Sequence, residues 1–231
     1  MHSGQGRIRA NVGCGASPTP GWVNLDNSWT VRLSRWPLLL SLLQRARLAG
    51  PEQLAFAQRA RESRIRWSSA LNLPFAAGSV EVIYSSHMLE HLGRQQARAF
   101  LAEVRRVLVP GGIVRLALPD LSLLVARYRE DLSADDFVAR TYLAHEPPRG
   151  VRARLRALAV GQRDHAWMYD GPSLIRLLGE CGFNSASAAS TRRVWSRRAP
   201  PRSSSRARST CASARTRVST SKRGADRVRS P

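Results

Sequence analysis

The chain has 231 residues, and its 37 basic and 16 acidic residues give a net charge of +21. The length suggests one domain with an appendage, and three widely spaced cysteines without a CxxC pair argue against a disulfide framework or a cysteine zinc site. The longest apolar run, Trp36 to Leu43, is too short to span a bilayer, and the first residues are not typical of a signal peptide. We therefore expect a cytoplasmic protein.

Strand-like and helix-like segments alternate along residues 1–183. In chain order, strands are predicted at 8–12, 22–26, 80–84 and 113–118, and helices at 94–108, 121–143 and 172–180. This alternation predicts the α/β class, with a Rossmann-like three-layer sandwich around a mostly parallel sheet. Residues 27–64 are an arginine-rich helical insertion that follows the second strand, and we interpret them as a lid.

Residues 184–231 differ sharply in composition from the rest. They contain 12 serines and 13 basic residues but a single acid, Asp226, and no Leu, Ile, Phe, Tyr or Met. Such a segment buries too little apolar surface to offset its ordering entropy. We expect a disordered basic Ser/Arg-rich tail, typical of a gene read out of frame (frameshifted), and hence a sheet whose C-terminal strands are missing or aberrant. A solvated linker and a nucleic-acid-binding arm are the alternatives.

Two motifs near the N-terminus indicate a ligand site. The first strand runs into Gly13-Cys14-Gly15, and glycines allow a tight turn and a close approach of the backbone to a ligand. The third glycine of the dinucleotide pattern GxGxxG is absent, which argues against NAD or FAD. Asp26 ends the next strand, where a carboxylate either accepts hydrogen bonds from ribose hydroxyls or serves a turn.

Five short motifs follow one another in the order of a known family. NVGCG, GWVNLD, LPF, SVEVIYSSHMLEHL and RRVLVPGG, within residues 8–120, resemble the class I S-adenosylmethionine-dependent methyltransferases, most of all their type 11 branch. The resemblance implies S-adenosyl-L-methionine as cofactor and methyl transfer as the reaction. It is weaker over residues 164–183, and the strands that complete this fold are not recognisable after Phe183.

The resemblance also implies which residues bind the cofactor. The backbone of Gly13, Cys14 and Gly15 would line its methionine and ribose parts, and Asp26 would accept from the ribose hydroxyls. Where the family has an aspartate for the adenine amino group, this chain has Ser68-Ser69-Ala70, so the hydroxyl of Ser69 would substitute. The remaining cofactor-binding candidates are Leu73 and Pro74 beside the adenine, and Ser85, Ser86 and His87 at the methionine end.

Catalytic and substrate residues are less constrained by the pattern. A base helps if the acceptor is a hydroxyl or an amine, and His87 is the first candidate by position, followed by His165. The HAWMYD segment offers Trp167, Tyr169 and Asp170 as substrate contacts, or is simply a packed loop anchored by Trp167. The branch favours a small molecule or a glycan as acceptor, since the fold alone does not choose one. A catalytically silent binding module with an RNA-binding tail is the alternative.

A zinc motif overlaps the same segment. His87 to His91 match H-x-x-E-H, in which two histidines bind zinc and Glu90 would act as general base of a hydrolase. That site requires the motif to lie inside a helix, whereas here it begins directly at the end of a strand. We therefore assign no metal site and keep the zinc hydrolase as a minor alternative.

Overall fold

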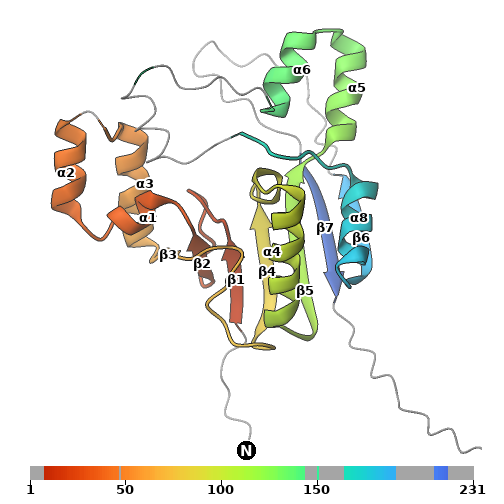
Figure 1. Cartoon of the computed structure of the whole chain (residues 1–231), viewed down its shortest axis with the longest axis horizontal. Helices are drawn as coiled ribbons and strands as arrows, with labels where there is room; N and C mark the ends of the chain where they lie inside the picture. The colour runs from red at the N-terminus through yellow and green to blue at the C-terminus, as the bar shows by residue number, and fades with distance from the viewer. Residues whose placement is uncertain (1–7, 47, 144–149, 151–163, 191–210, 218–231) are drawn as a thin grey trace, which may run out of the picture.

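Seven strands form one sheet in the order β3-β2-β1-β4-β5-β7-β6 in the computed structural model, which describes residues 8–46, 48–143, 150, 164–190 and 211–217 (Figure 1). The strands are β1 (Ile8–Val12), β2 (Val23–Asp26), β3 (Arg66–Trp67), β4 (Val80–Ser86), β5 (Leu108–Pro119), β6 (Asn184–Ser190) and β7 (Cys211–Arg217). The first five strands are parallel to one another. This arrangement confirms the predicted α/β class, although the two-residue strand β3 was not predicted.

The C-terminal strands are present, which corrects the expectation that they are missing and that residues 184–190 and 211–217 are disordered. β7 pairs antiparallel with β5, from Ile113 opposite Arg217 to Pro119 opposite Cys211, and β6 pairs antiparallel with β7. The ladder uses only backbone groups, so a segment without large apolar residues can still complete a sheet. The predictions for the rest of the tail concern 191–210 and 218–231, which lie outside the described residues.

The helices lie close to where the hydrophobic spacing predicts them. They are α1 (Trp29–Leu33), α2 (Pro37–Arg45), α3 (Pro51–Glu62), η1 (Leu89–His91, a 3-10 turn), α4 (Arg94–Val107), α5 (Leu121–Asp131), α6 (Ala134–Thr141) and α8 (Gly171–Glu180). The predicted helical region 121–143 is divided, because Leu132 adopts a left-handed conformation and Ser133 then caps α6. None of the helices in the described part of the chain is long and apolar enough to cross a membrane.

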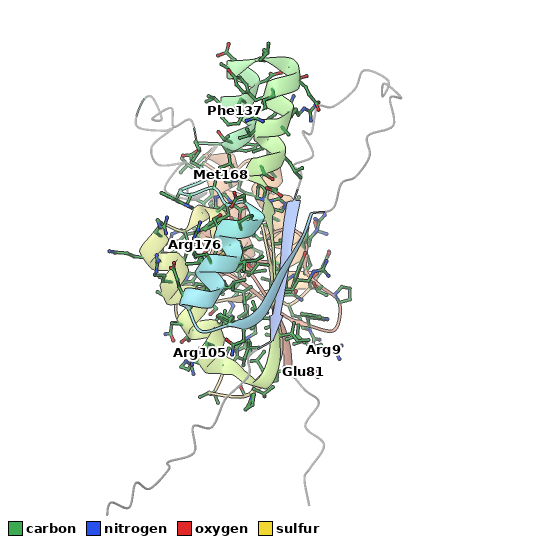
Figure 2. All side chains as sticks on the ribbon, turned by 90° about the vertical axis from the view of Figure 1, so that its right-hand side faces the viewer. Arg9, Glu81, Arg105, Phe137, Met168 and Arg176 are labelled. Atoms are coloured by element: carbon green, nitrogen blue, oxygen red, sulfur yellow. The ribbon has the colours of Figure 1, made fainter. Side chains whose placement is uncertain are left out.

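The main core lies between the sheet and the helices α4 and α8. Phe100 and Leu101 of α4 and Leu174 and Leu178 of α8 are fully buried in one cluster with strand residues such as Ile83. Figure 2 shows α4 and α8 on one side of the sheet, with Arg9 and Glu81 on the other. The driving force is burial of apolar surface, at ~25 cal/mol per Å².

The insertion forms its own small layer beside the β2 end of the sheet (Figure 1). Val31 of α1 and Ala60 of α3 pack with Cys14 and Ile65 in a second buried cluster. Pro37 stands at the first turn of α2 and Pro51 at that of α3, where a missing N–H costs nothing. Consequently α1 and α3 are fixed next to the loop that follows β1.

Candidate active site

A cavity of about 1050 Å³ opens where β1, β2 and β4 end. Ligands of parallel α/β sheets bind beyond the carboxyl ends of the strands, and small-molecule sites typically measure roughly 300–1,000 Å³. The residues that line the cavity are Val12, Gly13, Gly15, Ala16, Asp26, Asn27, Ser28, Trp29, Thr30, Glu52, Gln53, Ala55, Phe56, Arg59, Ser68, Ala70, His87, Met88, His91 and Leu92.

The loop after β1 requires glycine at two positions. Gly13 has φ +67° and Gly15 has φ +49°, in the left-handed region that side chains disfavour. A Cβ on Gly13 would also lie 2.4 Å from Cγ and 2.8 Å from Cβ of Met88, which approaches from the end of β4. The loop therefore presents bare backbone to the cavity.

Asp26 ends β2 on the cavity wall, with its carboxylate fixed by the chain around it. The backbone N–H of Gly15 donates to Oδ2 at 2.9 Å and that of Ser28 donates to Oδ1 at 2.8 Å. Each carboxylate oxygen can accept more than one hydrogen bond. Asp26 is thus a pre-oriented acceptor for hydroxyl donors of a ligand.

Cys14 is turned away from the cavity that its two glycine neighbours line. Its side chain belongs to the small core with Val31 and Ala60, and its thiol lies 3.7 Å from the carbonyl oxygen of Gly15. Burial, and then the negative charge of Asp26, raise the pKa of Cys14 to about 12. Any contribution of Cys14 to a ligand is therefore through its backbone.

Five other predicted cofactor residues, Ser69, Leu73, Pro74, Ser85 and Ser86, are not among those that line the cavity. Leu73 is buried in the core, with its N–H donating to Oε1 of Glu103 at 2.7 Å. The hydroxyl of Ser85 donates to the carbonyl oxygen of Val12 at 2.8 Å, which joins β4 to β1. At the predicted adenine position, Ser68 and Ala70 line the cavity wall, whereas Ser69 does not.

The insertion supplies the wall opposite the strands, a contribution that the motifs did not reveal. Trp29 of α1 and Phe56 and Arg59 of α3 line the cavity. The guanidinium of Arg59 donates to the carbonyl oxygen of Ala16 at 2.9 Å, which ties α3 to the glycine loop. The insertion is helical over α1, α2 and α3, and its role as a lid stays a prediction.

Four titratable side chains gather where β4 ends. His87 follows β4 with φ +52°, and its backbone N–H donates to Ala117 on β5. Its Nδ1 lies 3.2 Å from Oε1 of Glu90. Glu90 itself is completely buried, and neither carboxylate oxygen has a hydrogen-bond partner among the described residues. Two members of this group, His87 and His91, line the cavity.

His165 joins this group from a segment about 75 residues further along the chain. Its Nε2 lies 4.0 Å from Oε1 of Glu90, and its ring is edge-on to His91 at 5.0 Å. The N–H groups of Ala166 and Trp167 both donate to the backbone carbonyl of Glu90, which fixes the approach. Burial lowers the pKa of His165, and the nearby Glu90 opposes that effect. His165 is behind the cavity wall rather than on it.

The three predicted substrate residues lie elsewhere. Trp167 and Tyr169 line a second hollow of about 50 Å³ between α4 and α8, and Arg94 stacks over the ring of Trp167 at 4.7 Å. Burial raises the pKa of Tyr169. Asp170 caps α8 by accepting from the N–H of Ser173 at 2.8 Å, and the hydrogen bonds from Ser173 lower its pKa. The packed-loop interpretation of this segment fits these contacts.

Comparison with known proteins bears on what this cavity holds. The sequence model of the type 11 family described as "Methyltransferase domain" matches residues 11–116. A search of curated proteins found no match.

Solved structures share the fold at low sequence identity. A complex of the Haloferax volcanii Trm112 methyltransferase activator with a methyltransferase has a TM-score of 0.54 and 13% identity, over 97% of this chain and 87% of that one. A methyltransferase from Methanosarcina mazei has a TM-score of 0.52 and 14% identity, over 93% of both chains. One from Thermotoga maritima has a TM-score of 0.51 and 12% identity, over 91% and 81%.

The matched residues carry the glycine loop, Asp26 and the strand that leads to His87. The bare backbone of that loop and the free acceptor positions of Asp26 fit a nucleoside with ribose hydroxyls. Residues 11–116 therefore match the sequence model of a methyltransferase domain of the type 11 branch, a class of enzymes that uses S-adenosylmethionine as cofactor.

Proposed function

We propose that the chain transfers a methyl group from S-adenosylmethionine to a hydroxyl or amine of a small molecule or a glycan. The observation that carries this proposal is that one cavity is lined both by Gly13, Gly15 and Asp26 and by His87 and His91. The first set offers groups suited to a nucleoside, and the second offers groups suited to proton transfer.

The cofactor end is assigned to residues on the wall. Asp26 accepts hydrogen bonds from the ribose hydroxyls, because its carboxylate is already oriented by Gly15 and Ser28. The backbone of Gly13 and Gly15 contacts the methionine and ribose parts. Ser68 and Ala70 replace Ser69 as the residues beside the adenine, since they line the cavity at the end of β3.

The reacting end is assigned to His87. The cofactor supplies an electrophilic methyl group, so the protein mainly orients and desolvates the two reactants. A neutral His87 imidazole removes the proton from the acceptor as its oxygen or nitrogen attacks that methyl group. Glu90 lies 3.2 Å from Nδ1 and holds the ring toward the cavity.

The acceptor class is supported by the insertion wall. Trp29 and Phe56 offer flat apolar surfaces, while Glu52, Gln53 and Arg59 offer hydrogen-bonding groups. Flat apolar side chains beside hydrogen-bonding groups suit a polar molecule that also has apolar faces, such as a sugar. The size of the cavity leaves room for an acceptor beside a nucleoside.

Two measurements test the proposal. Calorimetry with S-adenosylhomocysteine reports cofactor binding, and mass spectrometry of a library of sugars and small hydroxyl or amine compounds reports transfer. We expect His87→Ala to keep its affinity for S-adenosylhomocysteine and to lose about 10²–10⁴-fold in turnover, as general-base removal typically does. Full turnover in that variant eliminates His87 as the base, and absence of cofactor binding in the unaltered chain overturns the proposal.

A further inference from the structure

Glu90, His91 and His165 form a cluster whose ligand atoms all lie within 4.8 Å of one another. We propose that these three side chains bind one divalent transition-metal ion, with Zn²⁺ the best match to two imidazoles and one carboxylate. This site revises our expectation of no metal, which rested on the helical geometry that the H-x-x-E-H pattern requires. The pattern here forms a 3-10 turn, and Glu90 becomes a ligand instead of a base.

The first argument is the state of the Glu90 carboxylate. It is 0% exposed, and within the described part of the chain neither of its oxygens has a hydrogen bond. Buried charges in proteins are paired, hydrogen-bonded or bound to a metal, because desolvation otherwise makes them very costly. The contact with His87 at 3.2 Å involves only Oε1. A cation between Glu90 and the two imidazoles would compensate the charge.

The second argument is the tautomer of each imidazole. Nδ1 of His91 lies 3.0 Å from the carbonyl oxygen of Asp164, and that oxygen can only accept, so Nδ1 carries the proton. Nδ1 of His165 lies 3.3 Å from the thioether sulfur of Met168, which is likewise an acceptor. The ring of His91 therefore keeps the lone pair of Nε2 for a ligand. An outer partner on the other ring nitrogen is the usual arrangement around metal-binding histidines.

The third argument is distance. Tetrahedral zinc with bonds of about 2.0–2.1 Å separates its nitrogen and oxygen ligands by roughly 3.4 Å. Nε2 of His165 is 4.0 Å from Oε1 of Glu90. Side-chain rotations that bring these two atoms closer by less than ~1 Å give that spacing for this pair. The N–H groups of Ala166 and Trp167 already hold this segment against the backbone of Glu90.

Three protein ligands leave one position open, which is typical of catalytic zinc. Of the three residues that would hold the ion, His91 lines the cavity in which we place the acceptor. There the ion would polarise a hydroxyl of the acceptor. This role rests on the proposed function, whereas binding of the ion does not.

The test is metal binding by the full, tag-free chain after treatment with EDTA. Titration with Zn²⁺ by calorimetry, and with Co²⁺ by visible absorption, is expected to give one ion per chain. Loss of a ligand in Glu90→Gln or His165→Ala should weaken binding by more than ~100-fold, beyond the 10–100-fold typical of outer partners. The matched control is Glu180→Gln, which removes an exposed carboxylate paired with Arg98 on α4 and should bind as the unaltered chain does.

Met168→Leu provides a second test if the ligand variants fail to fold. It preserves the volume of the side chain but removes the acceptor of the His165 Nδ1–H, so affinity should fall by about tenfold. The proposal is overturned if the unaltered chain binds no stoichiometric metal, or if Glu90→Gln and Met168→Leu bind as tightly as Glu180→Gln. Calorimetry with S-adenosylhomocysteine in EDTA separates this result from a failure of the proposed function, because cofactor binding is expected to persist without metal.

Discussion

Two carboxylates, Asp26 on the cavity wall and Glu90 buried behind His87 and His91, have opposite surroundings. Asp26 has both oxygens hydrogen-bonded, to the N–H groups of Gly15 and Ser28. Glu90 is fully buried, and neither of its oxygens accepts a hydrogen bond from the residues that the structure describes. The donors to Asp26 come from at most 11 residues away, whereas His165 approaches Glu90 from the other end of the domain.

The difference in hydrogen bonding between the two carboxylates indicates what each of them requires from a ligand. The cofactor end is oriented by the chain itself before any ligand arrives, and such preorganisation reduces the cost of binding. The histidine end contains a buried charge without adequate compensation, and therefore gains stability from a positive ligand. The contrast leads to measurable consequences, beginning with the largest.

The largest effect is expected for Gly13→Ala, which alters the preorganised end. A Cβ at this position would lie 2.4 Å from Cγ of Met88, and the alanine would have to keep the backbone angle φ +67°. We expect a loss of about 2–4 kcal/mol in the free energy of unfolding, as strain and overpacking add, with weaker binding of S-adenosylhomocysteine. Urea unfolding and calorimetry measure the two quantities.

Gly78→Ala is the matched control for Gly13→Ala. Gly78 has φ +64°, but a Cβ at this position would meet nothing within 4 Å, and the residue does not line the cavity. It should lose only the ~1 kcal/mol typical of a strained backbone and bind the cofactor normally. Equal losses in the two variants would show that the contact with Met88 does not constrain the loop.

Replacing each carboxylate by an apolar residue of similar size should change stability in opposite directions. Asp26→Leu leaves the N–H groups of Gly15 and Ser28 unpaired and should destabilise the chain by about 2 kcal/mol. Glu90→Met removes a buried carboxylate whose contacts are His87 at 3.2 Å and His165 at 4.0 Å, and should stabilise the metal-free chain by about 1–3 kcal/mol. Urea unfolding in EDTA at pH 8 measures both, and destabilisation by Glu90→Met contradicts the contrast.

A smaller effect is expected for Asp26→Asn, which keeps the shape but removes the charge. Hydrogen bonds to a charged group contribute about 1.5–3 kcal/mol and to a neutral one about 1 kcal/mol, so affinity for S-adenosylhomocysteine should fall by about tenfold. Asp170→Asn is the control, since Asn caps a helix as well as Asp does and Asp170 lies outside the cavity. Equal affinities in the two variants contradict the ribose assignment.

The sequence predicts the cofactor end far better than the histidine end. Gly13, Gly15 and Asp26 could be identified because a strand end, a tight turn and the next strand end are local patterns. The meeting of His165 with Glu90 depends on how a distant loop packs, and no local pattern encodes that contact. Likewise β7 is held by its backbone ladder with β5, so side-chain composition wrongly predicted an absent strand.

Cys14 offers the smallest and most specific check, because it lies between the two glycines yet turns away from the cavity. With a pKa of about 12, only about one thiol in 10⁴ is ionised at pH 8. We expect iodoacetamide to leave Cys14 largely unmodified at pH 8, and its rate to rise tenfold per pH unit as the thiolate fraction grows. Peptide mapping by mass spectrometry follows each cysteine separately.

Cys181 is the internal reference for this experiment. Burial also raises its pKa, but Arg98 opposes the shift and the residue is only partly buried, so it should react faster than Cys14. Cys14→Ala completes the test, since a backbone-only contact predicts an affinity for S-adenosylhomocysteine within about threefold of the unaltered chain, or ~0.6 kcal/mol. A larger loss of affinity would instead place the side chain of Cys14 at the cofactor end. Rapid alkylation of Cys14 that the cofactor blocks would do the same. Either result would make that end less rigid than the hydrogen bonds of Asp26 imply.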